Sequence, residues 1–182
     1  MGTIRRTLLG SVRLIVPIPR DPTKINMDEE STTTKKRTVV VAMDGSQQAE
    51  SAFNWFVQNL HKKDDDIIIV HCVHHIAHYT MGSVWAPIAA QAVVRAFEEE
   101  TKSAAKMCEK MEEMLKKKEI KGRVIQTSGD PGHGIVTAAA ECGADVIVVG
   151  SRGMGTIRRT LLGSVSDYLV HHSKIPVFIC RH

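Results

Sequence analysis

The sequence predicts an α/β fold, a doubly wound parallel sheet with helices on both faces. Two observations predict it: five short apolar runs recur after residue 37, and stretches with helical periodicity separate them. Within each run the apolar character is continuous, which is typical of strands covered on both faces, as in a parallel sheet. Strands that alternate with helices through right-handed crossovers give a doubly wound, five-stranded sheet.

The predicted strands span residues 38–43, 67–70, 124–127, 146–149 and 176–179. The predicted helices span residues 46–60, 88–118, 133–142 and 161–172. The first helix has one apolar stripe and Ser46 as its predicted N-cap. The second is long and amphipathic, with a methionine stripe that we assign to core packing. The third ends before Gly143, a C-cap signal. A charged cluster at residues 62–66 is expected to form a solvated loop.

Length and charge limit the classes of function. A chain of 182 residues, 43% hydrophobic, is long enough for one domain with a tail. Residues 1–37 hold eight of the 24 Lys and Arg residues but four of the 20 Asp and Glu residues, so the remainder is neutral. We therefore expect no nucleic acid as a partner. No apolar run approaches the ~20 residues of a membrane span, so we expect no membrane partner either.

The N-terminal segment is unusual, because residues 1–12 repeat residues 154–165 letter for letter. Residues 13–37 contain three prolines and no helix or strand period, so they are predicted to be a tether. We therefore expect residues 1–36 to be a flexible arm that carries a partial copy of residues 154–165, and residues 37–182 to be the domain. The copy lacks counterparts of residues 146–153, so deleting the arm should leave nucleotide affinity unchanged.

The four cysteines are far apart and form no Cys-x-x-Cys pair. Isolated cysteines in or beside apolar segments act as small hydrophobic residues, and they favour a reducing compartment. We therefore expect a cytoplasmic protein. The start of the chain is rich in arginine and free of acids, so it also resembles a mitochondrial presequence, an alternative that the sequence leaves open.

A glycine-rich turn after the fourth strand is the most informative motif. It has the form Gly150-x2-Gly153-x9-Gly163-Ser164, where a strand leads into a turn and then into a helix. Backbone N–H groups in such a turn, together with the positive end of a helix dipole, bind phosphate. Glycine is needed where a Cβ would keep the backbone away from the anion. A tight turn without a ligand is the alternative interpretation.

Two more segments leave predicted strands at the same edge of the sheet, where doubly wound folds bind ligands. Asp44 follows the first strand and could hold a nucleoside or a Mg²⁺ ion, although Asp-Gly is also a common turn pair. Gly129 follows the third strand. The segments converge with the glycine turn where the first and fourth strands are neighbours.

Other chemistries lack their motifs. The chain has no Gly-x4-Gly-Lys-[Ser/Thr] sequence, and its first strand–helix unit has no Gly-x-Gly-x-x-Gly. The histidines at positions 71, 74, 75 and 78 are spaced so that a strand would point them to opposite faces, so we expect no metal site there. We interpret them instead as strand-end histidines near an adenine pocket. No Ser/His/Asp or Cys/His nucleophile arrangement stands out.

Five segments together resemble the ATP-binding branch of the universal stress protein family. They are Val-Val-Val-Ala-Met-Asp-Gly-Ser46, Ser-Gly-Asp-Pro131, Ala-Asp-Val-Ile-Val-Val-Gly-Ser-Arg-Gly153, Leu-Gly-Ser-Val-Ser166 and Ile-Pro-Val-Phe-Ile179. The resemblance covers residues 37–182. It implies a Rossmann-like universal stress protein fold with the strand order 3-2-1-4-5.

The resemblance also implies the residues of a nucleotide site. Ala42, Met43 and Asp44 would line the nucleoside pocket, with Val73 near the adenine. The residues that would hold the phosphates are Gly150, Arg152, Gly153, Gly155, Gly163, Ser164, Val165 and Ser166. The implied ligand is ATP, together with Mg²⁺.

By the same resemblance, the protein would be an ATP-binding, nucleotide-dependent stress-response module that acts as a homodimer. The dimer would pair through the last strand, at Val177, Phe178 and Ile179. The sequence does not identify its protein partners. A slow ATPase or phosphotransferase is the alternative, because Asp44 could serve Mg²⁺ and Arg152 could neutralise charge. No residue stands out as a catalytic base, so we predict no catalytic residues.

Overall fold

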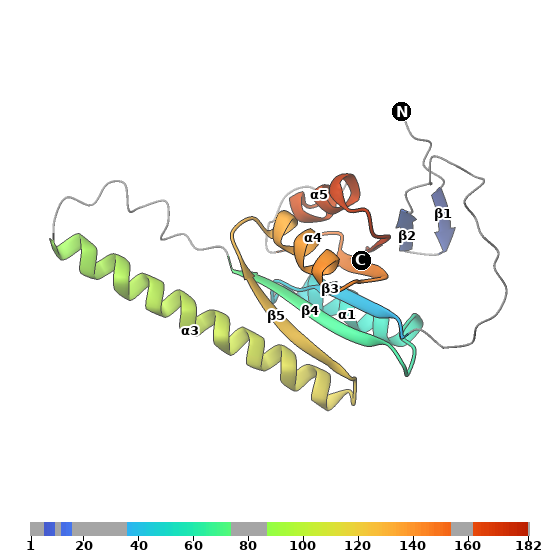
Figure 1. Cartoon of the computed structure of the whole chain (residues 1–182), viewed down its shortest axis with the longest axis horizontal. Helices are drawn as coiled ribbons and strands as arrows, with labels where there is room; N and C mark the ends of the chain where they lie inside the picture. Colours follow the sequence, from blue (N-terminus) through green and yellow to red (C-terminus); the bar gives the residue numbers. More distant parts are fainter. Residues whose placement is uncertain (1–5, 10–11, 16–35, 74–86, 154–161, 182) are drawn as a thin grey trace.

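A computed structural model of the protein describes residues 6–9, 12–15, 36–73, 87–153 and 162–181. In this part of the chain, seven strands form one sheet in the order β1-β2-β7-β6-β3-β4-β5. The strands are β1 (Arg6–Leu9), β2 (Val12–Ile15), β3 (Thr38–Ala42), β4 (Asp66–Val73), β5 (Gly122–Ser128), β6 (Val146–Gly150) and β7 (Val177–Cys180). The helices are α1 (Gln47–Asn59), α3 (Pro87–Lys117), α4 (Pro131–Glu141) and α5 (Ser164–His172). They cover both faces of the sheet (Figure 1).

The five strands from β3 onward are parallel to their neighbours and lie in the order β7-β6-β3-β4-β5. Numbered along the chain, this is the order 3-2-1-4-5, so the predicted doubly wound fold is confirmed. β3 and β6, the first and fourth of these strands, are neighbours, with Val41 opposite Val148. The segments that follow them therefore leave the sheet side by side.

Two hydrophobic cores, one on each face of the sheet, explain why the strands are apolar throughout. Val39 and Val41 of β3 belong to the core under α1 and α3, whereas Val40 and Ala42 belong to the core under α4 and α5. The helical residues that complete the first core are Phe53, Phe56, Met111 and Leu115, and those of the second are Ile135, Ala139 and Leu169. Burying one side chain of this size contributes about 1.5–3 kcal/mol.

Side chains cap two of the helices at the carboxyl edge of the sheet. The Ser46 hydroxyl accepts a hydrogen bond from the Ala49 N–H at 3.2 Å, which confirms Ser46 as the N-cap of α1. The Asp130 carboxylate accepts from the His133 N–H at 2.8 Å, and Pro131 occupies the first turn of α4. This cap explains why α4 begins two residues before the predicted start at residue 133.

α5 begins later than the predicted residue 161, because Gly163 is its N-cap and its first residue is Ser164. Residue 161 itself lies outside the described residues. The predicted helix at residues 88–118 corresponds closely to α3. In Figure 1, α3 runs along β5 and extends well past the end of the sheet.

The structure shows two strands that we did not predict, in the N-terminal arm. β1 and β2 form an antiparallel pair, with Arg6 opposite Ile15. β2 also pairs antiparallel with β7, with Val12 opposite Cys180 and Ile15 opposite Val177. The local sequence did not predict a strand at residues 13–15, because the hydrogen-bonding partner is more than 160 residues away. The other residues up to position 35 lie outside the described residues.

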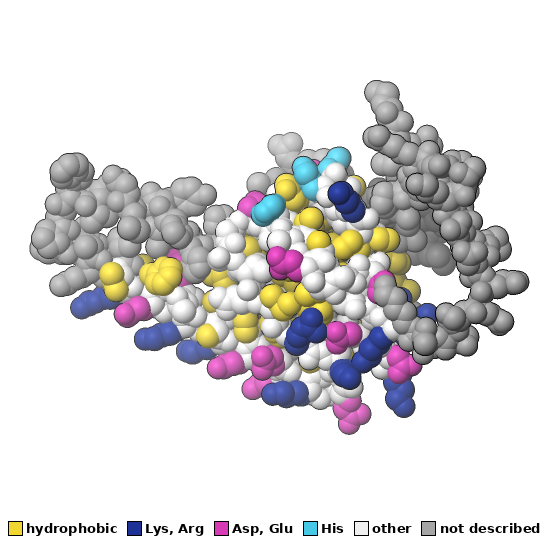
Figure 2. Space-filling view, viewed as in Figure 1, with side chains coloured by type: hydrophobic (Ala, Val, Ile, Leu, Met, Phe, Trp, Pro, Cys, Tyr) yellow, Lys and Arg dark blue, Asp and Glu magenta, His cyan; other side chains and the backbone are white. Residues whose placement is uncertain are grey.

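The surface carries charges of both signs. Figure 2 shows Lys and Arg side chains interspersed with Asp and Glu side chains along α3 and the lower border of the domain. Among the helices in the described ranges, none combines the length and apolar character that crossing a lipid bilayer requires.

Candidate functional site

The candidate site lies where β3, β4 and β6 end at one edge of the sheet. β3 ends at Ala42, and the next residue, Met43, donates its N–H to the Val70 carbonyl at 3.0 Å. β6 ends at Gly150, which lies two residues beyond the Val41–Val148 pair, level with Met43 in the register. The β3–α1 connection and the glycine turn therefore start beside each other.

Asp44 contacts the glycine turn. Its Oδ1 accepts a hydrogen bond from the Ser46 N–H at 2.9 Å, which holds the carboxylate at the start of α1. A Cβ built on Gly153 would overlap the Asp44 carboxylate. A side chain at position 153 would therefore have to displace the Asp44 carboxylate. Gly45 has a positive φ of 83°, so glycine also suits the bend between Asp44 and Ser46.

Gly163 returns to the glycine turn and closes it. Its N–H donates to the Ser151 carbonyl at 2.8 Å, while the Ser151 N–H donates to the Cys180 carbonyl at 2.7 Å. A Cβ on Gly150 would lie 3.0 Å from the Arg152 carbonyl oxygen, so backbone packing favours glycine there. A Cβ on Gly163 would lie 3.4 Å from its nearest atoms, an ordinary contact. Packing within the described structure therefore does not require glycine at position 163.

The N-terminus of α5 differs from those of α1 and α4. Gly163, its N-cap residue, has no side chain that could accept from the N–H groups of the first turn. Ser164 is exposed, and Val165 packs against the second core. The Ser166 side chain is buried, and its hydroxyl donates to the Gly163 carbonyl at 2.9 Å. In this arrangement Ser166 holds the start of the helix, whereas Ser164 faces solvent.

Four other predicted site residues lie at, or just past, the ends of β3, β4 and β5. Ala42 and Met43 are buried on opposite faces of the sheet, one in each core. Val73 is the last residue of β4, and its carbonyl accepts from the Gly129 N–H at 3.3 Å. Val73 and Gly129 therefore lie together, one strand outward from β3. Gly155 lies outside the described residues.

His71 is a residue whose role the sequence did not reveal. It is buried on β4, and its Nδ1 lies 2.9 Å from the Met43 carbonyl oxygen. This hydrogen bond ties β4 to the residue just before Asp44. From the sequence we rejected His71 as a metal ligand and interpreted it as a strand-end histidine near an adenine pocket, but no local pattern predicted this hydrogen bond. Within the described residues, no three His, Cys, Asp or Glu side chains gather as a metal site, and the other three histidines of that run lie outside them.

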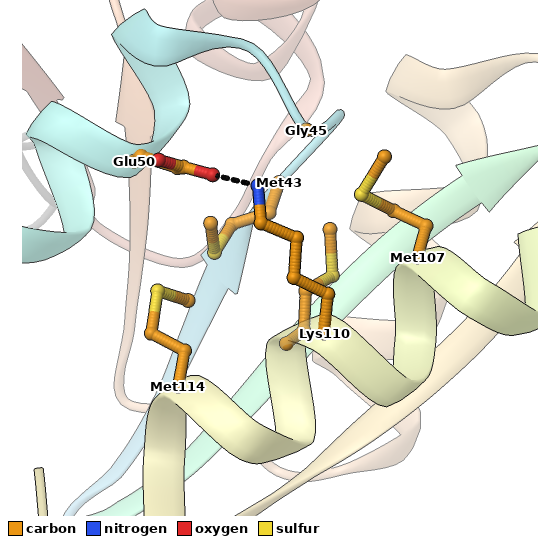
Figure 3. A pocket seen from close by; sticks show the side chains of 7 residues that line it. Met43, Gly45, Glu50, Met107, Lys110 and Met114 are labelled. Carbon is orange, nitrogen blue, oxygen red and sulfur yellow. Dashed lines mark hydrogen bonds and ion pairs between the residues drawn. The ribbon is translucent and has the colours of Figure 1, made fainter. Parts of the chain in front are cut away.

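A small cavity lies beside Gly45, between α1 and α3 (Figure 3). Its volume is about 10 Å³, room for a single water molecule. Met43, Met107, Met111 and Met114 line it, and Lys110 Nζ pairs with Glu50 Oε1 at 2.6 Å across it. Met111 is buried in the first core, consistent with the packing role that we assigned to the methionine stripe.

A second cavity, of about 340 Å³, lies between β5 and α4 at the outer edge of the sheet. Its lining includes Thr127, His133, Thr137 and Glu141, and none of the predicted site residues. Burial, aided by the Asp130 carboxylate, raises the pKa of the nearby Cys72 thiol, which donates to the Gly129 carbonyl at 3.6 Å. This shift disfavours the thiolate, the nucleophilic form of cysteine.

Comparison with known proteins places this geometry in context. Residues 36–181 match the sequence model of the Universal stress protein family. The chain is 31% identical over 146 residues to universal stress protein YxiE of Bacillus subtilis (strain 168), a match that covers 79% of this chain and 97% of that protein.

Two solved structures share the fold. The hypothetical protein MJ0577 has a TM-score of 0.66 at 22% identity, over 81% of this chain and 96% of that one. A universal stress protein family protein from Arabidopsis thaliana, At3g01520, solved with AMP bound, has a TM-score of 0.58 at 21% identity, over 80% of this chain and 92% of that one.

Proposed function

Because this chain belongs to the universal stress protein family, we propose that it binds ATP at the carboxyl edge of its sheet and acts as a nucleotide-dependent stress-response module. The observation that carries the proposal is the meeting of three features at one point. The glycine turn contacts Asp44, Gly163 closes that turn, and α5 begins there without a side-chain cap.

The phosphates would lie at the start of α5. The N–H groups of its first turn and the positive end of its dipole suit an anion, and Gly163 leaves room for close approach. We assign the phosphate contacts to the residues that the resemblance implied: Gly150, Arg152, Gly153, Gly155, Gly163, Ser164, Val165 and Ser166. The AMP bound to the Arabidopsis relative supports a nucleotide as the ligand.

The nucleoside would lie toward β3 and β4. The Asp44 carboxylate can accept hydrogen bonds from ribose hydroxyls, and Val73 offers an apolar contact for the base. Ala42, Met43 and Gly129 shape this end of the site through their backbones. Mg²⁺ that is bound together with phosphates takes one or two carboxylate ligands, a role that suits Asp44.

We further propose that the protein is cytoplasmic and acts as a homodimer paired through the outer edge of β7, at Val177, Phe178 and Ile179. In this structure β2 occupies that edge. A dimer of this kind therefore requires β2 to leave β7.

A thermal-shift titration tests nucleotide binding. A ligand that binds only the folded protein stabilises it by about 2.7 kcal/mol at a hundredfold excess over Kd, so ATP, ADP or AMP should raise Tm in a concentration-dependent way. If no adenine nucleotide raises Tm up to millimolar concentration, the proposal is wrong.

Gly163→Ala tests where the phosphates bind. The added methyl group fits the described structure, with its nearest atoms 3.4 Å away, but it occupies the approach to the start of α5. We expect the Kd for ATP to rise at least tenfold, while Tm without nucleotide falls by only a few degrees. Ser173→Ala is the matched control. It removes a hydroxyl that bonds both the Ile175 carbonyl and the Ile175 N–H at the other end of α5. It should lower Tm similarly and leave the Kd unchanged.

A further inference from the structure

The outer edge of β7 is covered by a segment of the same chain. β7 is the last of the parallel strands, and an uncovered edge strand presents a row of unpaired N–H and C=O groups that can pair with another chain. Here β2 pairs with all four residues of β7, from Val177 to Cys180. The hairpin of β1 and β2, called the N-terminal hairpin below, therefore extends the sheet past its parallel part.

β7 does not depend on the hairpin for its place in the fold. It pairs with β6 on its inner side, with Ile147 opposite Val177. Val177 and Ile179 are buried in the second core and Cys180 in the first. Without the hairpin, β7 would therefore remain in the sheet, with its outer backbone groups free.

The hairpin, by contrast, depends on β7. Among the described residues, β1 pairs with β2, and β2 pairs with β1 and β7. An isolated two-stranded hairpin is at best marginally stable in water, so pairing with β7 supplies much of its stability. A hairpin detached from β7 would therefore have little stability of its own.

We propose that the N-terminal hairpin is an intramolecular cap on β7 that keeps a second copy of the chain from pairing with the same edge. The occupant that the cap excludes is the β7 of that second copy. β2 shows that this edge accepts an antiparallel strand, and two antiparallel β7 strands related by a twofold axis would present identical surfaces to each other. The four residues of β7 carry no charge, so no like-charge repulsion opposes the pairing. The inference rests on the dimer proposed above but not on nucleotide binding.

Mass action favours the cap over a second copy. Residues 16–37 connect β2 to β3, so the hairpin competes at the effective concentration of a tethered segment, on the order of 1 mM. At ~10 µM protein, it therefore outcompetes an equally good external strand by about a hundredfold. Loss of the hairpin, or a rise in local protein concentration, would shift the chain toward the dimer.

Sedimentation of the full chain and of a variant lacking residues 1–15, at protein concentrations of ~5–200 µM, tests the proposal. We expect the dimer dissociation constant to fall at least tenfold in the deletion variant. If both proteins are dimers with the same constant, the cap is wrong and the dimer stands. If both are monomers throughout, the cap and the dimer edge are both wrong. The thermal shift with ATP is measured separately and should be the same for both proteins, so a failure of nucleotide binding would be recognised independently.

A point variant tests the same idea in the full-length chain. Leu14→Pro removes an N–H from the middle of β2, which has pairing partners on both sides. We expect it to dimerise like the deletion variant, while Thr33→Pro in the connecting segment should behave like the parent. Hydrogen exchange at residues 177–180 gives a second readout: in Leu14→Pro, protection should increase with protein concentration. If protection is as independent of protein concentration in Leu14→Pro as it is in Thr33→Pro, the proposal is wrong.

Discussion

An ion pair between a partly exposed arginine and a buried aspartate joins the residue before β3 to the turn before β4. Asp65 is 1% exposed, and Arg37 donates from Nε to Asp65 Oδ1 at 2.9 Å and from a terminal nitrogen to Oδ2 at 2.5 Å. The Lys62 N–H also donates to Oδ2, at 2.8 Å. Burial by itself would raise the pKa of Asp65, but the hydrogen bonds from Arg37 and Lys62 outweigh it, so the pKa lies below its usual value. The prediction that residues 62–66 form a solvated loop is therefore wrong for Asp65.

Asp65→Asn should destabilise the protein by about 1–3 kcal/mol at pH 7, because it leaves the Arg37 guanidinium without its anionic partner. The folded-state pKa of Asp65 is lowered, so its contribution is present above the unfolded pKa of about 3.9 and is lost as pH falls through the folded pKa. The parent and variant should therefore differ in urea unfolding at pH 7 and converge in acid. Asp64→Asn, at an exposed neighbour, is the control and should change little. A difference that is as large in acid as at pH 7 would contradict this account.

At the scale of elements, one valine of the repeated segment lies in a strand in one copy and in a helix in the other. Residues 9–12 and 162–165 are identical, yet Val12 lies in strand β2 and Val165 in helix α5. β2 forms because β7 supplies hydrogen bonds, and α5 forms because Gly163 bonds the glycine turn and Leu169 packs into the second core. The residues after the shared valine differ, so the local sequence and the tertiary contacts together place Val12 in a strand and Val165 in a helix.

α3 is a helix whose two halves differ in support. Ala104, Met111 and Leu115 are buried against the domain, whereas Val94 is 57% exposed and Phe97 is 45% exposed. Packing supplies most of the stability of a helix in a protein. We therefore expect amides at residues 94–103 to exchange with solvent at least tenfold faster than those at 107–115. Equal protection along the helix in native-state hydrogen exchange would show that the first half has support of its own.

At the scale of the whole molecule, one sheet separates two cores and belongs to both. Successive residues of β3 point into opposite cores. If β3 moved, the packing on both faces of the sheet would therefore be disturbed. A single domain built this way should unfold in one cooperative transition.

Leu169→Ala tests this coupling. Leu169 is fully buried in the second core, whereas Trp55 packs on the first, across the sheet. The substitution should cost about 2–5 kcal/mol, and the fluorescence of Trp55, in a Trp85→Phe background, should report the same loss as far-UV circular dichroism. A Trp55 transition that keeps the parent midpoint would mean that the two cores unfold separately. Thr137→Ala, at an exposed position of α4, is the control.

Much of the fold was predictable because its signals are local. The five parallel strands and four helices follow from runs of apolar residues and their period, and the Ser46 cap follows from residue type and position. The convergence of Asp44 with the glycine turn was predicted on the condition that the first and fourth strands are neighbours, and the structure meets that condition.

The sequence by itself determined the layered α/β architecture and the chain segments that reach one edge of the sheet. Only the tertiary structure determined which distant residues and strands pair with each other. It paired Asp65 with Arg37, gave the Ser166 hydroxyl a partner in the Gly163 carbonyl, and paired residues 12–15 with β7. The physical reason is that a hydrogen bond or ion pair between distant residues leaves no period or local pattern in the chain, and its free energy exists only once both partners have been brought together.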